Sequence, residues 1–235
     1  MRIIKTVILR NHNNRKFVIG VPVTDEEFNQ MFEFRYKSYF ESGYIDDSKK
    51  NDFKDIDKYD IAKKCLYIIA TVDNEIIGTS RLIKDSPLPT KKYFNFTEPD
   101  IIKNIPSHKR GEVSRLISKY PLSIKNIVPP HFITIMLLLG LIELAVDGGI
   151  EGGYCFIKKY LFDILDSLKV PVYEIKPSEL IYKEKYLYPF FYNFPKNPVI
   201  PIYYKTHEII TRTNKLIEHV AQVENIQMIN NNRIQ

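Results

Sequence analysis

Residues 65–83 read CLYIIATVDNEIIGTSRLI, and this stretch decides the fold. Two apolar, β-branched runs, 65–72 and 76–83, flank the polar triplet Asp73-Asn74-Glu75. Apolar runs on both sides of such turn residues are typical of a β-hairpin. We therefore expect two antiparallel strands here, the second of which contains Gly78-Thr79-Ser80-Arg81-Leu82.

On the N-terminal side of this hairpin, residues 24–42 carry the pattern of a helix. Thr24 followed by Glu27 is a capping box, aromatic and apolar residues then recur at helical spacing, and Gly43 closes the segment. A short strand is expected before it, over residues 15–23. Residues 46–60 are dense in aspartate and lysine, which predicts an exposed loop or a short helical turn.

On the C-terminal side, Pro87 and Pro89 break the pattern before a short helix around 101–106 and a third strand at 111–118. Residues 131–146 are apolar on nearly every side, as in a helix buried between layers. Strand 154–157, helix 160–168 and strands 172–175 and 199–204 follow. The class is therefore α/β or α+β, with one central sheet flanked by helices. We expect a single domain over 1–217 and a polar, frayed tail over 218–235.

The composition is that of an ordinary globular protein. Of the 235 residues, 44% are hydrophobic and 26% are charged, and the longest apolar run is about half a bilayer span, so we expect no membrane insertion. Cys65 and Cys155 lie in strand-like runs and no targeting signal is visible, which favours a reduced, cytoplasmic protein. The net charge of +6 favours an acidic partner without identifying it.

Several catalytic motifs are missing from the sequence. It contains no His-x-x-x-His, no Cys-x-x-Cys, no Gly-x-Ser-x-Gly and no P-loop, which argues against a zinc site, a serine hydrolase and a nucleoside triphosphatase. No glycine lies between Arg115 and the expected helix at His131, which argues against a backbone cradle for a pyrophosphate there. We expect neither a metal nor a cofactor.

The residues that stand out are arginines and carboxylates near the ends of the expected elements: Arg35, Asp57, Asp60, Arg81, Glu112 and Arg115. Alternation along the third strand places Glu112 and Ser114 on one face and Arg115 on the other. Burying an unpaired charge costs several kcal/mol, so these charges either form a structural ion-pair network or face a cleft.

Four motifs follow one another along the chain: Phe34-Arg35-Tyr36-Lys37-Ser38-Tyr39-Phe40, Asp57-Lys58-Tyr59-Asp60, Ile77-Gly78-Thr79-Ser80-Arg81-Leu82 and Gly111-Glu112-Val113-Ser114-Arg115-Leu116. Together they resemble the signature of the autoinducer-synthase-like acyltransferases. The resemblance implies the GCN5-related N-acetyltransferase (GNAT) fold and a place among long-chain N-acyl amino acid synthases and acyl-homoserine-lactone synthases. It covers residues 34–116, and the second half fits only in its order of helices and strands.

The resemblance also implies a reaction in which an amine attacks an acyl thioester, usually one borne on acyl carrier protein. This chemistry needs a proton acceptor and donors for the developing oxyanion. Glu112 matches the family's carboxylate, and backbone N–H groups near Arg115 supply the donors, so these two residues are the expected catalytic pair. The expected substrate-binding residues are Arg35, Tyr44, Asp57, Asp60, Arg81 and Ser114. An arginine left unpaired by the carboxylates of the set is expected to clamp the carboxylate of an amino acid.

Two departures from the family pattern bear on the substrates. Homoserine-lactone synthases usually carry a tryptophan after the first helix, where this chain has Gly43-Tyr44, which weakens a role as an autoinducer synthase using S-adenosylmethionine. Acetyl-CoA members of the fold carry a glycine-bearing loop where this chain has Lys119-Tyr120-Pro121-Leu122-Ser123. A donor on acyl carrier protein tolerates that difference better than acyl-CoA. The lead hypothesis is an N-acyl amino acid synthase, and the lactone synthase and a non-catalytic acyl- or carrier-binding module are the alternatives.

Basic residues on the surface suggest where the carrier docks. Lys91, Lys92, Lys109 and Arg110 could form a patch for the acidic carrier protein, although scattered basic pairs are usually just a solvated face. The aromatic cluster between Tyr186 and Phe194 could stack nucleic-acid bases, but its prolines and low basic charge favour packing. The expected partners are therefore acyl carrier protein and a small-molecule amine, and not nucleic acid or a membrane.

Overall fold

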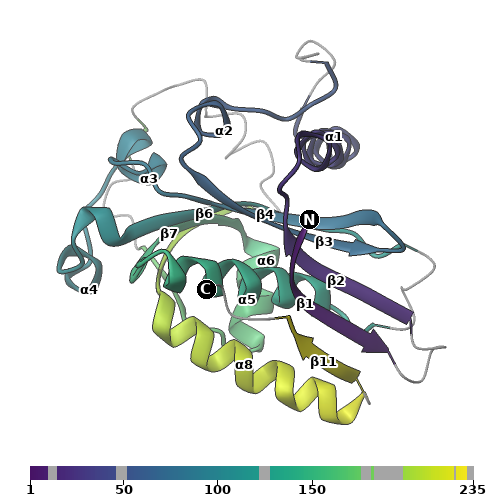
Figure 1. Cartoon of the computed structure of the whole chain (residues 1–235). Coiled ribbons are helices and arrows are strands. Elements are labelled where there is room, and N and C mark those ends of the chain that lie inside the picture. The colour runs from purple at the N-terminus through teal and green to yellow at the C-terminus, as the bar shows by residue number, and fades with distance from the viewer. Residues whose placement is uncertain are drawn as a thin grey trace.

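The computed structural model of the chain describes residues 1–9, 15–45, 52–121, 128–175, 181–182, 198–224 and 226–231. Within these residues, nine strands form one sheet in the order β11-β1-β2-β3-β4-β6-β7-β10-β8 (Figure 1). Neighbouring strands run antiparallel except β6 and β7, which run parallel. The sheet is therefore mixed, and the α/β (α+β) class predicted from the sequence is confirmed.

The strands of this sheet are β1 (Arg2–Leu9), β2 (Arg15–Val21), β3 (Cys65–Val72), β4 (Glu75–Ile83), β6 (Arg110–Ser118), β7 (Gly152–Lys158), β8 (Val172–Glu174), β10 (Val199–Lys205) and β11 (Ile226–Asn230). The short strands β5 (Phe94–Asn95) and β9 (Ile181–Tyr182) pair with each other. The helices are α1 (Asp25–Glu41), α2 (Lys58–Ile61), α3 (Pro89–Tyr93), α4 (Asp100–Lys103), the 3-10 helix η2 (Ser107–Lys109), α5 (Phe132–Asp147), α6 (Lys159–Ser167) and α8 (Thr206–Val223).

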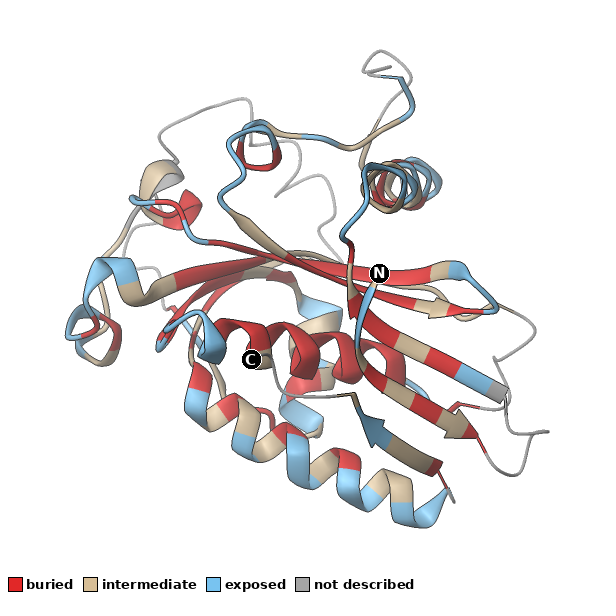
Figure 2. Cartoon of the chain, viewed as in Figure 1, coloured by how far each residue is buried: buried red, intermediate tan, exposed pale blue. Residues whose placement is uncertain are grey.

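Helices cover both faces of the sheet (Figure 1). Helix α5 packs against β2, β3, β4 and β6 on one face, and α8 covers α5 from outside. Helices α1, α2 and α3 lie on the other face. Almost every residue of α5 is buried, as its uniformly apolar sequence predicts (Figure 2). The sheet and α5 thus form a rigid base beneath the α1 face.

The hairpin and the first helix form as predicted. Strands β3 and β4 are joined at Asp73 and Asn74, both of which have positive φ (50° and 68°), the backbone that suits a two-residue hairpin turn. At the start of α1, the Thr24 hydroxyl accepts a hydrogen bond from the Glu27 N–H (3.2 Å), and the Glu27 carboxylate accepts one from the Thr24 N–H (3.1 Å). This capping box fixes the beginning of α1.

At the chain ends, one strand was not predicted and one prediction is wrong. Strand β1 was not expected, yet it pairs with β2 and β11, and its residues alternate so that Val7 and Leu9 are buried. The expected frayed tail over 218–235 begins inside α8, and β11 pairs with β1 beyond it. The polar residues after 218 are largely the solvent side of an amphipathic helix whose Val220 and Ala221 pack on the core. The aromatic cluster between 186 and 194 lies outside the described residues.

Strands β6 and β7 pair along only part of their length. The register runs from Arg110 opposite Gly152 to Val113 opposite Cys155, although β6 continues to Ser118 and β7 to Lys158. In the paired part the two backbones lie very close together. A Cβ added to Gly153 would lie 1.6 Å from the Gly111 carbonyl oxygen, so only glycine fits there. In the described chain, the edge of β6 beyond Val113 therefore has no β7 partner, and this edge lies beside the candidate site.

Candidate active site

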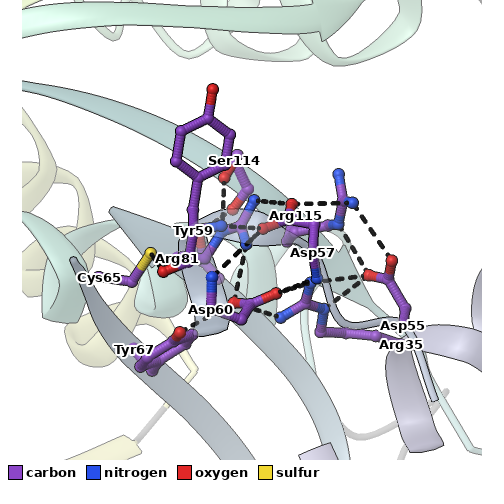
Figure 3. A network of polar contacts seen from close by, with 11 residues as sticks. Arg35, Asp55, Asp57, Tyr59, Asp60, Cys65, Tyr67, Arg81, Ser114 and Arg115 are labelled. Atoms are coloured by element: carbon purple, nitrogen blue, oxygen red, sulfur yellow. Dashed lines mark hydrogen bonds and ion pairs between the residues drawn. The ribbon is translucent and has the colours of Figure 1, made fainter. Parts of the chain in front are cut away.

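Six charged side chains form a closed ring of ion pairs on the α1 face of the sheet (Figure 3). They come from α1, α2, β4, β6 and the segment that leads into α2. Around the ring, the N···O distances are 2.8 Å for Arg35–Asp55, 2.7 Å for Asp55–Arg115, 3.4 Å for Arg115–Asp57, 2.8 Å for Asp57–Arg81, 2.7 Å for Arg81–Asp60 and 3.1 Å for Asp60–Arg35. Three arginines alternate with three aspartates, so the ring has no net charge.

The motif Asp-Lys-Tyr-Asp builds one side of the ring by capping α2. Asp57 is the N-cap, and its carboxylate accepts hydrogen bonds from the N–H groups of Tyr59 (2.9 Å) and Asp60 (3.3 Å). The Asp60 carboxylate accepts one from the Asp57 N–H (3.0 Å) and another from the Tyr67 hydroxyl (2.8 Å). The short helical turn predicted here is confirmed. The predicted exposure is wrong for Asp60, which is buried because Arg35 and Arg81 neutralise it.

Most of the ring is removed from water. The side chains of Arg35, Asp60 and Arg81 are 1–2% exposed and that of Asp55 is 10% exposed, whereas Asp57 and Arg115 are each 27% exposed. Burial raises the pKa of the Asp57 carboxyl, but hydrogen bonds and charge from Arg81, with the charge of Arg115, outweigh it and hold that pKa well below its usual range. The Asp57 carboxylate therefore stays ionised at neutral pH.

A backbone irregularity turns Arg115 into the ring. Arg115 has φ of +56°, a left-handed conformation that is uncommon for a residue with a side chain, and the pairing of β4 with β6 shifts register between Thr79 and Arg81. Ser114 lies on the same side, since its hydroxyl accepts a hydrogen bond from Arg81 Nε (3.0 Å). The prediction that Ser114 and Arg115 lie on opposite faces is therefore wrong, because the bulge breaks the alternation of β6.

Glu112 is buried near the ring and is not part of it. It is 3% exposed, lies on β6 opposite Ile83 of β4 and Tyr154 of β7, and accepts a hydrogen bond from the Thr90 N–H (2.8 Å). Burial raises the pKa of the Glu112 carboxyl to about 7, against the smaller effect of the Thr90 hydrogen bond. A carboxyl with this pKa can exchange a proton at neutral pH, which is what a general base needs.

The expectation of an unpaired arginine is wrong for Arg35, Arg81 and Arg115. Each of them contacts two carboxylates, because Asp55, which the sequence analysis missed, supplies the third anion of the ring. One signal for Asp55 exists in the sequence: in Asp55-Ile56-Asp57, an extended backbone points the two carboxylates to the same side. Thr90, which holds Glu112, has no comparable signal.

Tyr44 is connected to the exposed part of the ion-pair ring through Tyr39. Its aromatic ring contacts that of Tyr39 (5.9 Å between centroids), and the Arg115 guanidinium carbon lies 5.4 Å from the Tyr39 centroid. Lys158, at the end of β7, lies over the Tyr44 ring, with its Nζ 5.3 Å from the ring centroid. Tyr39 and Tyr44 therefore form an aromatic wall between Arg115 and the end of β7.

The four residues expected to dock a carrier are all engaged within the chain. Lys91 pairs with Glu98 (3.6 Å), Lys109 with Glu151 (2.6 Å), Arg110 with Glu98 (2.8 Å), and Lys92 with Asp85. Lys91 and Lys109 keep substantial exposure, whereas Arg110 is mostly covered. Among the residues that the structure describes, no group of three histidine, cysteine or acidic side chains could hold a metal, and no helix could cross a membrane.

Comparison with known proteins gives one family and one fold. The family model for the N-acyl amino acid synthase FeeM matches residues 30–149, slightly more than half of the chain, including the whole ring, Glu112 and α5. No curated protein matches the sequence. Among solved structures, the chain is similar to the CoA-dependent acyl-homoserine lactone synthase MesI, with 18% identity over 82% of this chain and 88% of MesI and a TM-score of 0.56.

The same fold occurs in two other lactone synthases. For LasI the identity is 13%, the coverage is 82% of this chain and 91% of LasI, and the TM-score is 0.57. For BjaI with SAM and isopentyl-CoA the identity is 14%, the coverage is 84% and 82%, and the TM-score is 0.50. At these identities the likeness concerns the fold alone. The GNAT-like fold and the family resemblance predicted from the four motifs are confirmed.

Proposed function

The chain belongs to the FeeM family of N-acyl amino acid synthases, which are N-acyltransferases, and from this premise we propose that it transfers a long-chain acyl group from acyl carrier protein to the amine of an amino acid. One observation carries the proposal: a buried carboxyl, Glu112, whose pKa is about 7, lies on β6 just before this strand loses its pairing with β7. A proton acceptor thus lies next to an open strand edge.

In the proposed reaction, Glu112 accepts a proton from the acceptor's ammonium group, directly or through a water molecule. The neutral amine attacks the thioester carbonyl carbon, a C–N bond forms, and the C–S bond breaks. The nitrogen of the new C–N bond loses its second proton to solvent, and the departing thiolate takes up the proton from Glu112, so the enzyme returns to its starting state. Backbone N–H groups of residues 115–118, on the part of β6 without a β7 partner, would stabilise the oxyanion.

The proposed donor is acyl carrier protein rather than acyl-CoA. The segment after β6 lacks glycine, Lys119 pairs with Glu41, and the Tyr120 hydroxyl accepts a hydrogen bond from the Ile133 N–H (3.0 Å). The Lys119 N–H donates to the Ile77 carbonyl oxygen (2.7 Å) and Pro121 has no N–H, so neither residue offers a free backbone donor for a pyrophosphate. The net charge of +6 and the exposed Lys91 and Lys109 support a carrier that is acidic.

Docking through Lys91, Lys92, Lys109 and Arg110 remains part of the proposal in a modified form. Because each of these side chains already has a carboxylate partner, the carrier would exchange partners with Glu98, Asp85 or Glu151. Such exchanges between exposed charges are favoured by long-range attraction and weakened by salt. A cytoplasmic location follows from this donor and from the two free cysteines, Cys65 and Cys155.

Reconstitution tests the proposal. The purified protein is incubated with palmitoyl-acyl carrier protein or palmitoyl-CoA and with a mixture of the free amino acids, with S-adenosylmethionine in a parallel reaction, and products are identified by mass spectrometry. We expect an N-palmitoyl amino acid, formed faster from the carrier protein. An acyl-homoserine lactone as the product would make the chain an autoinducer synthase. A folded protein that forms no amide from either donor would refute the proposal.

A further inference from the structure

The ion-pair ring has one link that differs from the other five. The Arg115–Asp57 contact is the longest, at 3.4 Å, and it joins the two most exposed members. Each partner is anchored independently of this link. Arg115 keeps two hydrogen bonds to Asp55 (2.7 and 3.2 Å), and Asp57 keeps two to Arg81 (2.8 Å each). The link can therefore break while Arg115 stays bonded to Asp55 and Asp57 stays bonded to Arg81.

A neutral zwitterion is the ligand that fits such an opening. The link presents one cation and one anion side by side, and an α-amino acid carries the opposite pair, a carboxylate next to an ammonium. Because the ring is neutral, a zwitterion adds no net charge to a site that is largely removed from water. A lone carboxylate would add a negative charge, and S-adenosylmethionine, with a sulfonium besides its zwitterion, would add a positive one.

We propose that the acceptor amino acid binds by inserting into the Arg115–Asp57 link, with its carboxylate on Arg115 and its ammonium on Asp57. The inference rests on the proposed function and names its acceptor site. The inserted ligand replaces a 3.4 Å contact by two charge-assisted hydrogen bonds and leaves the other five links of the ring intact.

In this arrangement Asp57 and Glu112, on one face of the sheet, have different roles. Asp57 bonds Arg81, Arg81 bonds Ser114, and Glu112 lies two residues before Ser114 on β6, on the same face. Asp57 has a lowered pKa and holds the ammonium without taking its proton, whereas Glu112 has a raised pKa and can take it. The Tyr39 ring beside Arg115 offers an apolar surface to the ligand's side chain.

The alternative is a purely structural role, in which the ring only holds α1 and α2 against the sheet. Titration calorimetry without an acyl donor separates the two ideas. The probes are L-phenylalanine, chosen because the Tyr39 ring lies beside Arg115, L-phenylalaninamide, which lacks the carboxylate, and L-3-phenyllactate, which lacks the ammonium. The wild type should bind phenylalanine about tenfold or more tightly than either analogue, the change expected for one charge-assisted hydrogen bond. Equal affinities for the three probes, or no binding of phenylalanine, would overturn the inference.

Two variants assign the contacts. Asp57→Asn, which keeps an N-cap residue, should weaken the binding of phenylalanine and phenylalaninamide but not that of phenyllactate. Arg115→Lys should weaken the binding of phenylalanine and phenyllactate but not that of phenylalaninamide. Asp163→Asn and Arg212→Lys, the same changes outside the ring, are the matched controls. Equal weakening of all three probes by either variant would mean that the ring is structural.

The same measurements separate this inference from the proposed function. If the expected probe pattern is seen but no amide forms from any donor, the proposed reaction fails and the zwitterion site stands. If amide forms but neither variant distinguishes the probes, the acceptor lies elsewhere. Should Asp57→Asn fail to fold, the three affinities of the wild type still decide whether both charges of the ligand are recognised.

Discussion

Replacing Glu112 by glutamine should stabilise the protein above pH 7. The carboxyl is 3% exposed, and burial raises its pKa from 4.5 to about 7. Between these two values the native state holds a proton that the unfolded state has released, so the stability of the wild type falls as the pH rises. A pKa difference of this size corresponds to about 3 kcal/mol, and the full penalty is present above pH 7.

Glutamine removes the charge and keeps an oxygen that can accept the Thr90 N–H. The gain in unfolding free energy of Glu112→Gln should therefore be small near pH 5 and approach about 3 kcal/mol at pH 8, or roughly 6–12 °C in melting temperature for a chain of this size. Glu151→Gln, on the surface, is the matched control.

Thermal or urea unfolding of wild type and variant at several pH values between 5 and 8 measures this gain. A gain that is the same at pH 5 and pH 8 would refute the reasoning, because only titration of Glu112 makes it depend on pH. A variant less stable than the wild type at every pH would show that the native site favours the carboxylate.

Three further outcomes follow from the structure. Gly153→Ala should prevent folding because its Cβ would lie 1.6 Å from a backbone oxygen, whereas Gly148→Ala, with nothing nearer than 3.3 Å, should fold, as circular dichroism would show. Asp55→Asn should lower the unfolding free energy in urea by roughly 3–5 kcal/mol, since it leaves the buried Arg35 and the half-buried Arg115 short of an anion. Stability supplied by Asp55 and Asp57, whose pKa values are lowered from 3.8, should be complete above that pH and decline below it in an acid titration.

The parts of the fold that could be predicted from sequence are those whose structure depends on residues a few positions apart in the chain. The turn at Asp73-Asn74, the Thr24–Glu27 capping box and the apolar helix α5 each have a signal within a few positions, and each forms as predicted. Strand β1 was missed and the C-terminal tail was wrongly expected to fray, because pairing between β1 and β11 joins opposite ends of the chain. No local pattern reports such a pairing.

In the candidate site, too, residues with a local sequence signal could be predicted, and features that depend on distant residues could not. The four motifs contain five of the six ring members, so these five could be identified from the sequence. The sixth, Asp55, and the turn of Arg115 into the ring depend on three-dimensional placement. The left-handed backbone of Arg115 arises where β4 and β6 shift register, and binary alternation along β6 cannot indicate it. The resulting ring has no free arginine, which is why acceptor recognition is better assigned to an ion-pair link than to a lone guanidinium.

The most direct test of the account is the single-turnover rate of amide formation, measured across pH with saturating acyl donor for the wild type and Glu112→Gln. The wild type, whose Glu112 takes a proton from the bound ammonium group, should lose about tenfold in rate for each pH unit below 7 and level off above it, whereas Glu112→Gln needs an amine that is already neutral, so its rate should keep rising above pH 7. We expect the wild type to be about 10²–10⁴ times faster at pH 7 and the ratio of the two rates to shrink as the pH rises further. A ratio that stays near one, or one that does not change with pH, would contradict the claim that Glu112 accepts the proton.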